Sequence, residues 1–226
     1  MEDNILKTDV LIVGAGTSGM VAALCLAKWN IKSIIVEKNL EVNEHPKAHE
    51  LNTRSIEILE SIGVLIQDLE REASPISDGN RIAFCTSIEN EFGEIDLDKD
   101  IDDPDKYEKH VKNTRPYLNI SQTEIERVLR RTIIENPYID LLSEHTWKSV
   151  EDIDKTILSE VNDINNMQDI KISAKYLLAA DGASSTSCEW DCNSESTACD
   201  SSLSADVSCK TLFEKLCYRS QTTSLP

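Results

Sequence analysis

The sequence predicts an α/β fold built on a parallel β-sheet. Thr8 to Val13 is a short apolar run that meets glycines at its end, and Ser18 to Trp29 has the apolar spacing of a helix. Ser33 to Val36 is a second, β-branched run. A strand, a helix and a strand within about 30 residues form the unit that joins two parallel strands. The later run Tyr176–Ala180 is apolar throughout, as expected of a strand that is covered on both faces.

The composition fits a globular chain with an acidic surface. The chain has 226 residues, which suffices for one large domain or two small ones. Its formal net charge of −18 repels phosphate backbones and anionic membranes, so the sequence predicts no nucleic-acid partner. No apolar run approaches the roughly 20 residues that span a bilayer, and Met1 to Lys7 lacks the basic start of a secretory signal. We expect a cytoplasmic protein without a membrane span.

Two further helices carry start or stop signals. Asn52 to Ile62 is amphipathic and is followed by Gly63 at a C-cap position. Ser121 to Ile134 begins with a serine that can cap the helix, and Glu124 stands where a capping box needs an acid. The remaining strand candidates are 81–86, 139–143, 147–152, 155–161 and 169–180.

Two segments depart from this regular pattern. Residues 75–115 mix strand-like and charged sequence, and the acidic stretch 89–109 predicts a surface excursion. Residues 188–226 are rich in Cys, Ser and Thr with little apolar periodicity, so we expect a disordered tail after a domain of residues 1–187. Five of the seven cysteines lie in this tail. An odd number of cysteines without an export signal argues against a disulfide framework.

The histidines and cysteines predict no metal site. His45 and His49 are spaced like two ligands on one helix, but Pro46 disfavours a regular helix there. Cys188 and Cys192 lack the partner pair that a zinc site needs. We therefore expect both histidines to be loop residues, and no metal to be bound.

A glycine-rich turn follows the first strand and opens the first helix. It consists of Gly14, Ala15, Gly16, Thr17, Ser18 and Gly19. The first glycine permits a tight turn, the second lets the backbone approach a pyrophosphate, and the third lets helix and strand pack closely. The start of the helix also offers N–H groups and a partial positive charge to an anion. A glycine turn with a purely structural role is the alternative.

Glu37 and Lys38 end the second strand and extend this candidate site. A carboxylate at that place can accept hydrogen bonds from both hydroxyls of an adenosine ribose. The alternative is a solvated glutamate beside Lys38. Strand, glycines, helix and acid together predict a dinucleotide-binding unit.

Four stretches of the chain, taken in order, point to a known family. They are Val10–Glu37, His45–Glu57 followed by Leu59 and Gly63, Asn119–Leu129, and Lys175–Ser185. They resemble the FAD-dependent aromatic-ring monooxygenases, the family that includes phenol and p-hydroxybenzoate hydroxylases. The resemblance implies a three-layer, Rossmann-like FAD-binding domain over residues 1–187, with residues 75–115 as part of a β-rich insertion. It also implies FAD as cofactor, NADPH or NADH as electron donor, and O₂ and an aromatic small molecule as substrates.

The resemblance assigns roles to residues beyond the glycine turn. Arg54 would lie near the flavin or its phosphates, where its guanidinium suits a bidentate contact. The alternative for Arg54 is a surface ion pair with Glu50 or Glu57. Asp181 and Gly182 match a second fingerprint of the family, which touches FAD and is implicated in the use of a pyridine nucleotide. Their alternative is an ordinary turn at the end of a strand.

The third matching stretch carries one more implied contact. Gln122 would hydrogen-bond FAD from the start of its helix, with Glu126 and Arg127 as helix-surface residues. The alternative is that Gln122 is a plain residue of the first helical turn.

The sequence departs from the family after Gly182. The arginine that the family carries two residues later is absent, as are its Gly-Asp motif and later substrate sheet. The resemblance therefore implies an incomplete, C-terminally truncated domain, and it assigns no catalytic residue. Two other interpretations stay open: a catalytically inactive FAD-binding remnant, and an NAD-dependent oxidoreductase or nucleotide-binding module.

Overall fold

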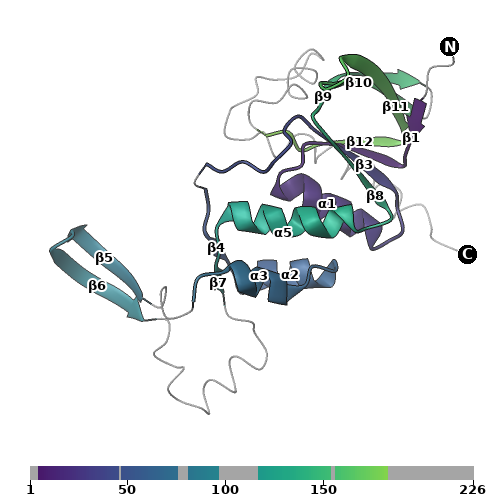
Figure 1. The fold of residues 1–226 in the computed structure, drawn as a ribbon. Coiled ribbons are helices and arrows are strands. Elements are labelled where there is room, and N and C mark those ends of the chain that lie inside the picture. Colours follow the sequence, from purple (N-terminus) through teal and green to yellow (C-terminus); the bar gives the residue numbers. More distant parts are fainter. Residues whose placement is uncertain (1–4, 46, 76–80, 97–116, 154–155, 183–226) are drawn as a thin grey trace, which may run out of the picture. The chain divides into compact units, whose positions relative to one another are not determined.

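The computed structural model describes residues 5–45, 47–75, 81–96, 117–153 and 156–182 (Figure 1). The predicted tail and most of the predicted acidic excursion lie outside these residues. The chain divides into two compact units, which we describe separately. The sheet unit comprises Met1–Val42 and Ile133–Pro226, and the helical unit comprises Asn43–Thr132.

The sheet unit contains a parallel sheet of four strands in the order β12-β2-β3-β8. The strands are β2 (Val10–Val13), β3 (Ser33–Glu37), β8 (Ile139–Ser143) and β12 (Tyr176–Ala179). β2 is the central strand for the candidate site, because it pairs with β12 on one side and with β3 on the other. The predicted parallel α/β sheet is confirmed. All four strands run the same way, so their carboxyl ends meet at one edge.

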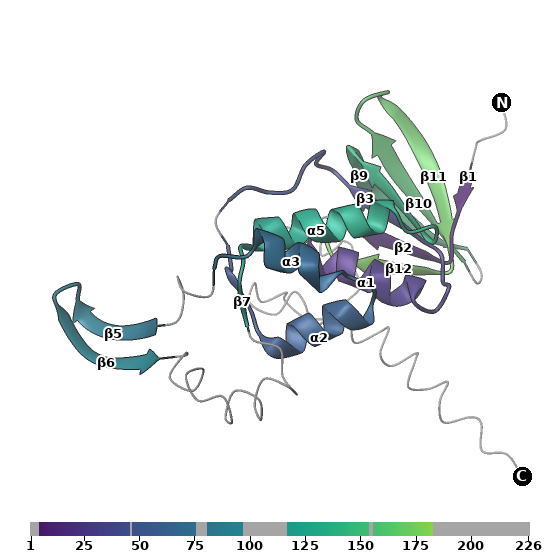
Figure 2. The ribbon, with the colours of Figure 1, turned by 60° about the horizontal axis from the view of Figure 1, so that its bottom comes forward.

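Helix α1 (Thr17–Ala27) lies on one side of the parallel sheet, and a second sheet lies on the other side (Figures 1 and 2). The second sheet has the order β1-β11-β10-β9. Its strands are β1 (Ile5–Lys7), β9 (His145–Ile153), β10 (Thr156–Asp163) and β11 (Gln168–Ala174). Every residue of β2 is buried, as expected for a strand covered on both faces. These three layers confirm the layered architecture that the family resemblance implies.

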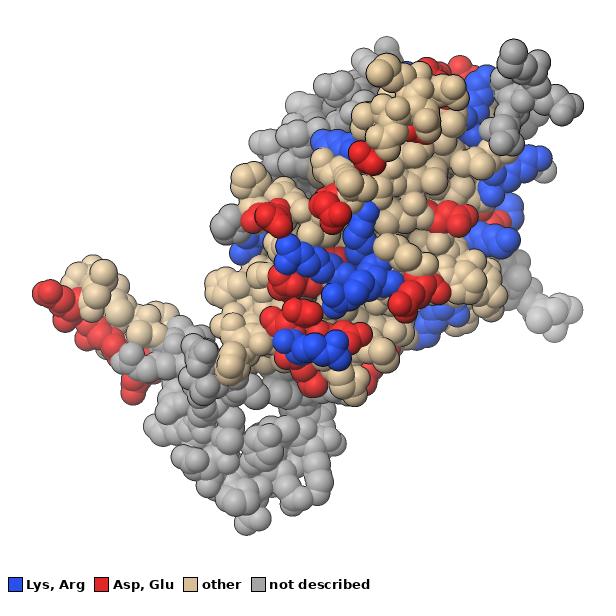
Figure 3. All heavy atoms as spheres, viewed as in Figure 1, with Lys and Arg blue, Asp and Glu red and all other residues tan. Residues whose placement is uncertain are grey.

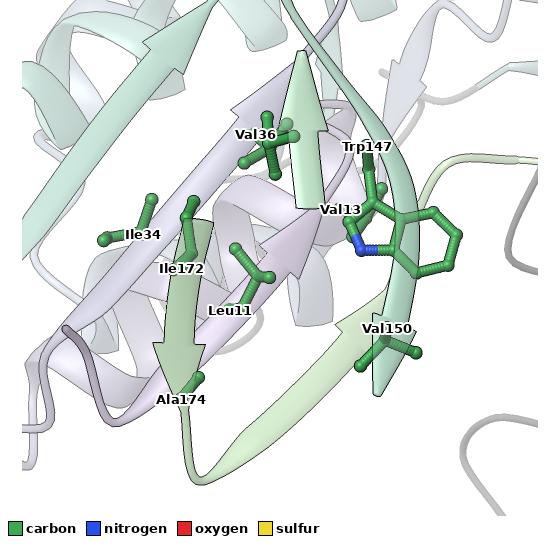
Figure 4. Packing of buried hydrophobic residues seen from close by; sticks show 9 residues of the cluster. Leu11, Val13, Ile34, Val36, Trp147, Val150, Ile172 and Ala174 are labelled. Atoms are coloured by element: carbon green, nitrogen blue, oxygen red, sulfur yellow. The ribbon is translucent and has the colours of Figure 1, made fainter. Parts of the chain in front are cut away.

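The core between the two sheets is made by residues that face each other across the layers (Figure 4). It comprises Leu11, Val13, Ile34, Val36, Trp147, Val150, Val161, Ile172 and Ala174. Residues two apart on a strand share a face, which explains the spacing within each strand. Trp147 is buried, and its Nε1 donates a 3.2 Å hydrogen bond to the buried hydroxyl of Ser159. This bond satisfies the indole N–H, whose burial without a partner would be costly.

The predicted strand 169–180 consists of two strands that belong to different sheets. β11 lies antiparallel to β10, whereas β12 lies parallel to β2. The chain passes between the sheets at Lys175, whose N–H donates to the carbonyl oxygen of Asp9 over 3.0 Å. The pattern of the sequence changes at the same place. The second half of β11 alternates between deeper and shallower positions, and β12 continues as an unbroken apolar run.

The helical unit contains α2 (Thr53–Ser61), α3 (Ile66–Glu72) and most of α5 (Gln122–Ile134). The predicted caps of α2 are present. Asn52 Oδ1 accepts a 2.8 Å hydrogen bond from the N–H of Ser55, and Gly63 follows the helix with a φ of 94°. The described residues contain no helix with the length and apolar character to cross a bilayer.

Helix α5 begins as the sequence predicts, but only half of its capping box forms. The hydroxyl of Ser121 accepts a 3.3 Å hydrogen bond from the N–H of Glu124. The carboxylate of Glu124 pairs with Arg127 one turn later, rather than with the N–H of Ser121. A charged partner at i+3 competes with the neutral backbone N–H, because hydrogen bonds between two charged groups are the stronger ones.

Residues 75–115 contribute a hairpin of β5 (Arg81–Ser87) and β6 (Asn90–Asp96). The start of the predicted acidic excursion is therefore a strand. Backbone pairing with β5 and a contact between the rings of Phe84 and Phe92, whose centroids are 6.4 Å apart, favour this strand despite its acidic residues. Both phenylalanines remain exposed.

Candidate functional site

Three of the predicted site segments meet at the carboxyl edge of the parallel sheet. Gly14 directly follows β2, Glu37 ends β3, and Asp181 with Gly182 comes soon after β12. The N–H of Gly14 donates to the carbonyl oxygen of Val36 over 2.8 Å, which ties the glycine turn to β3. Ligands of open α/β sheets bind outside the carboxyl ends of the strands. The first stretch of the family resemblance and the described part of the fourth thus lie at the same edge of the sheet.

Two glycines of the turn are required by close contacts within the chain. Gly14 has a φ of 101°, and a Cβ placed there would lie 2.4 Å from the carbonyl oxygen of Ala180. A Cβ on Gly19 would lie 2.0 Å from the carbonyl oxygen of Gly14. Both contacts are with backbone atoms, which cannot swing aside. Gly14 and Gly19 therefore hold β2, β12 and α1 close together, as the sequence predicts for the third glycine.

Gly16 differs from the other two glycines, because a Cβ there would meet no atom of the described residues within 4 Å. It is the N-cap residue of α1, with a φ of −70° and a ψ of 177° that any residue can adopt. The first turn of α1 contains no acidic residue, and Gly16 has no side chain to cap it. The N–H groups at a helix start lack carbonyl partners within the helix and favour an anion. The open side of Gly16 fits a group that approaches the backbone.

Glu37 is fixed against the glycine turn by three hydrogen bonds. Its Oε2 accepts from the N–H of Ala15 over 2.8 Å. Its Oε1 accepts from both the backbone N–H and the side-chain amide of Asn39, each over 2.9 Å. The carboxylate is therefore oriented by the turn and by Asn39. Lys38, the other predicted residue at this place, has an exposed side chain.

Asn39 orients Glu37, a role that the sequence pattern does not predict. Its side chain acts on a residue two positions earlier, a local pattern that asparagine often forms next to a turn. The signal that could have identified it is an amide two residues after the acid that ends β3. Such a signal is common in loops, so only the structure distinguishes it from an ordinary turn residue.

The second and third stretches of the family resemblance meet in the helical unit. β4 (Glu50–Leu51) pairs antiparallel with β7 (Leu118–Asn119). Beyond this ladder, the N–H of Ile120 donates to the carbonyl oxygen of His49 over 3.0 Å, and the N–H of Gln122 donates to that of Ala48 over 2.8 Å. These bonds anchor the start of α5 to a segment far away in the sequence.

Arg54 lies in the first turn of α2 and forms the surface ion pair that the sequence offers as an alternative. Its Nη1 is 3.0 Å from Glu57 Oε2, and the two side chains are 76% and 40% exposed. This pairing does not test the implied contact with FAD. An exposed pair of this kind stabilises the folded chain by roughly 0–1 kcal/mol, so a ligand could displace it.

Gln122 is half-buried in the first turn of α5, and its Nε2 donates a 2.8 Å hydrogen bond to Glu126 Oε1. The expectation that Glu126 lies on the helix surface is wrong, because this residue is only 3% exposed. It follows Ile125 and precedes Leu129, both buried, so it falls inside the buried stripe of the helix. Arg127 does lie nearer the surface, where it pairs with Glu44 over 3.0 Å.

Figure 3 shows basic and acidic side chains interspersed over the face that it presents. The helical unit contains several pairs of opposite charge. They include Arg71 with Asp68, Arg127 with Glu44 and Glu124, and Arg131 with Glu72. His45 and His49 lie outside helices and strands. Within the described ranges, no group of three His, Cys, Asp or Glu residues could hold a metal ion.

Comparison with known families decides which dinucleotide-binding family the site represents. The profile of the family described as "FAD binding domain" matches residues 7–212, which is most of the chain. The chain belongs to the FAD binding domain family. This confirms the cofactor expected from the resemblance. The glycine turn, the open side of Gly16 and the oriented carboxylate of Glu37 are consistent with the diphosphate and ribose of FAD.

Curated proteins that resemble this chain include named monooxygenases. FAD-dependent monooxygenase apdD of Emericella nidulans is 29% identical over 183 residues, which cover 78% of this chain and 29% of that protein. Phenol 2-monooxygenase of a Pseudomonas species is 30% identical over 186 residues, covering 81% and 30% of the two chains. The chain thus spans about a third of the length of the curated relatives it matches. The resemblance to aromatic-ring monooxygenases is confirmed.

Solved structures of FAD binding domain proteins share the fold. The flavin-dependent monooxygenase PieE, crystallised with FAD and substrate, matches with a TM-score of 0.69 at 26% identity, over 81% of this chain and 32% of that one. A substrate-free form of the rebeccamycin biosynthetic enzyme REBC matches with a TM-score of 0.67 at 25% identity, over 83% and 35% of the two chains. The match extends over both units of the chain, since each alone is too short to account for it.

Proposed function

We propose that this chain forms the FAD-binding part of an NADPH- or NADH-dependent monooxygenase that hydroxylates an aromatic, phenol-like small molecule. One observation carries the proposal. The glycine turn, the start of α1 and the carboxylate of Glu37 converge at the carboxyl ends of neighbouring parallel strands. The names of the matching relatives, among them a phenol 2-monooxygenase, support the aromatic substrate.

In the sheet unit, the main chain does most of the binding. The N–H groups at the start of α1 hold the diphosphate, and the absent side chain of Gly16 lets it come close. Glu37 accepts a hydrogen bond from a ribose hydroxyl with the remaining lone pair of Oε2, because Ala15 and Asn39 occupy the other three acceptor sites. Asp181 and Gly182 follow the adjacent strand and border the same edge.

In the helical unit, side chains contribute the remaining contacts. Arg54 leaves Glu57 to contact the flavin or a phosphate, an exchange that sacrifices only an exposed ion pair. Gln122 donates or accepts one hydrogen bond. FAD supplies the redox chemistry that couples a reduced pyridine nucleotide and O₂ to hydroxylation, and the protein supplies binding and orientation. No residue of the chain is assigned a catalytic role.

The first experiment is to incubate the full-length chain with FAD, desalt it and record the visible spectrum. Retained flavin absorbance supports the proposal. A folded but colourless protein contradicts it and favours the nucleotide-binding module, which titration with NAD would then identify. FMN is the matched control ligand, because it has the flavin and one phosphate but lacks the adenosine, whose ribose Glu37 is proposed to bind.

Turnover separates an enzyme from an inactive FAD-binding remnant. The flavin-loaded chain is mixed with NADPH or NADH in air, with and without phenol, and both nucleotide oxidation and hydroxylated product are measured. Oxidation that phenols stimulate, with product formed in step, supports the monooxygenase. Retained FAD without any turnover supports the remnant. The cytoplasmic location and the lack of a nucleic-acid partner stay predictions, which cell fractionation and a binding assay at low salt would test.

A further inference from the structure

The two oxygens of the Glu37 carboxylate have unequal surroundings. Oε1 accepts from Asn39 twice, once from the backbone N–H and once from the side-chain amide, each over 2.9 Å. Oε2 accepts from the N–H of Ala15 over 2.8 Å. Within the described part of the chain, Glu37 has no further hydrogen-bond partner. Since a carboxylate offers about four acceptor sites, both sites on Oε1 are filled and one site on Oε2 stays open.

The open acceptor site belongs to the oxygen that contacts the glycine turn. Ala15 is buried in this turn. The N–H of Gly14, just before it, donates to the carbonyl oxygen of Val36, the strand residue just before Glu37. Two successive N–H groups of the turn thus hold the end of β3 and Oε2. FAD carries its adenosine ribose next to the diphosphate, so the open site lies on the oxygen that is nearer to the proposed cofactor.

Asn39 is well suited to keep Oε1 filled. Its two donors bind the same atom, and it lies only two residues after Glu37. A bond to an ionised carboxylate is stronger than one between neutral groups, and a contact this local orders little of the chain. A ribose hydroxyl that displaced the amide would only exchange one bond to the carboxylate for another, and either donor can bond to water instead. Asn39 therefore stays in place when the ligand binds.

We propose that Asn39 is a positioning residue that limits Glu37 to one of the two hydroxyls of the adenosine ribose. This inference rests on the proposed function, in which Glu37 contacts that ribose. It narrows the expectation from the sequence that the carboxylate accepts from both hydroxyls. One hydroxyl bonds to Oε2, and the other bonds to water. The chain therefore distinguishes two forms of FAD that differ only in which ribose hydroxyl is missing.

The first test uses the unaltered chain with FAD and its 2′-deoxy and 3′-deoxy forms, in which the adenosine ribose lacks one hydroxyl. Fluorescence titration gives the three dissociation constants. The analogue without the bonded hydroxyl binds about tenfold more weakly than FAD, because a hydrogen bond to a charged group is lost. The other analogue binds within about twofold of FAD. Equal losses for the two analogues would overturn the proposal, because Glu37 would then accept from both hydroxyls.

The variant Asn39→Ala identifies the residue responsible. The backbone N–H at this position still donates to Oε1, but the site that the amide filled becomes open. The second hydroxyl can then bond to Glu37, so both analogues bind this variant about three- to tenfold more weakly than FAD does. A merely structural role would change the affinities for all three ligands by the same factor. An unchanged ratio between the two analogues would therefore overturn the role of Asn39.

Asn166→Ala is the matched control variant. The backbone N–H and the side-chain amide of Asn166 both donate to the carboxylate of Asp163, over 3.1 and 2.7 Å. The substitution therefore removes the same kind of hydrogen bond from another turn of the sheet unit. It leaves the ratio between the two analogues as it is in the unaltered chain. A ratio that changes as it does in Asn39→Ala would overturn the specific role of Asn39.

The outcomes separate this inference from the proposed function. A folded chain that binds neither FAD nor its analogues overturns the proposed function, and the role of Asn39 fails with it. Binding that is insensitive to the loss of either hydroxyl overturns the role of Asn39 but leaves the binding of FAD established. Discrimination between the analogues that disappears in Asn39→Ala supports both.

Discussion

The two units hold the residues that we propose to bind the cofactor by different means. In the sheet unit, main-chain atoms dominate: Gly14 and Gly19 meet backbone carbonyls, and Glu37 is held by the N–H of Ala15. In the helical unit, side chains hold side chains, as Arg54 is held by Glu57 and Gln122 by Glu126. Contacts between backbone atoms cannot change without destabilising the fold. Contacts between exposed side chains can change with little effect on stability. Substitutions at Gly14 and Gly19 should therefore affect folding, and those at Arg54 and its partner should affect affinity.

The largest effect is expected where backbone crowds backbone. Gly14→Ala adds a Cβ 2.4 Å from a carbonyl oxygen at a φ that alanine rarely adopts, and Gly19→Ala adds one 2.0 Å from a carbonyl oxygen. Overpacking of this kind costs about 1–3 kcal/mol or more, and each kcal/mol lowers the midpoint of a chain this long by about 2–4 °C. Thermal unfolding without FAD measures the effect. An unchanged thermal midpoint for both variants would mean that these close backbone contacts do not limit the stability of the fold.

Gly16→Ala is a substitution in the sheet unit that is expected to change the affinity for FAD without changing the stability of the fold. Its Cβ meets no atom within 4 Å in the part of the chain that the structure describes, and its backbone conformation suits alanine, so the thermal midpoint stays the same. If the diphosphate lies against this residue, the methyl group intrudes and weakens FAD binding about 10- to 100-fold, equivalent to about 1–3 kcal/mol. Fluorescence titration with FAD measures it. Normal affinity would place the diphosphate elsewhere.

Glu37→Gln comes next in size. The neutral amide loses the charge that strengthens its hydrogen bond to the ribose, so FAD binds about tenfold more weakly. Binding of FMN is unchanged, because FMN lacks the adenosine ribose. Parallel titrations with FAD and FMN make the measurement. An equal loss for both ligands would show that Glu37 acts on the fold of the turn and not on the ribose.

The sequence predicts more of the sheet unit than of the helical unit. The reason is again that the first depends on backbone contacts and the second on side-chain contacts. The glycine turn has a fixed spacing, because its contacts are between backbone atoms that every such chain shares, so the sequence predicts the turn after the first strand and the acid at the end of the second. The role of Asn39 and the burial of Glu126 could not be predicted, because each depends on which neighbour a polar side chain meets in space. The strand 169–180 was assigned as one because local pattern does not reveal a change of sheet. The short strands β4 and β7 carry too few residues to leave a pattern at all.

A smaller effect is expected in the helical unit, with opposite signs for two partners. Arg54→Ala removes a charged contact to FAD and weakens its binding about fivefold. Glu57→Gln releases Arg54 from its exposed ion pair and strengthens FAD binding by up to about threefold, since such pairs are worth less than about 1 kcal/mol. Both dissociation constants come from the same titration. Equal affinities for both variants would leave Arg54 as the surface residue of the alternative interpretation.

The smallest effect is expected for a side-chain ion pair in the sheet unit. This pair is an exception, because the other contacts discussed for this unit are made mainly by backbone atoms. Lys175 Nζ donates to Asp9 Oδ1 over 2.6 Å where the chain changes sheets, and this contact lowers the pKa of Asp9 below 3.8 and raises that of Lys175 above 10.5. A lowered carboxyl pKa stabilises the fold above pH 3.8, and the gain is lost as the pH falls through the lower, folded-state pKa. The raised lysine pKa acts below pH 10.5, and that gain is lost as the pH rises through the folded-state value. The ion pair therefore makes its full contribution to the stability of the fold between about pH 3.8 and pH 10.5.

Asp9→Asn should therefore lower the thermal midpoint slightly at neutral pH, and the difference from the unaltered chain should shrink in acid. The unaltered chain still loses stability in acid without this pair, because the pKa values of Asp163 and Asp169 are lowered as well, chiefly by hydrogen bonds from Asn166 and Lys148. Only the difference between the two chains reports on Asp9. A constant difference down to pH 2 would mean that the carboxylate contributes through its shape or its backbone contact with Lys32, and not through its charge. In that case the passage of the chain from β11 to β12 would be held by the backbone hydrogen bond from Lys175 to Asp9, as the glycine turn is held by backbone contacts.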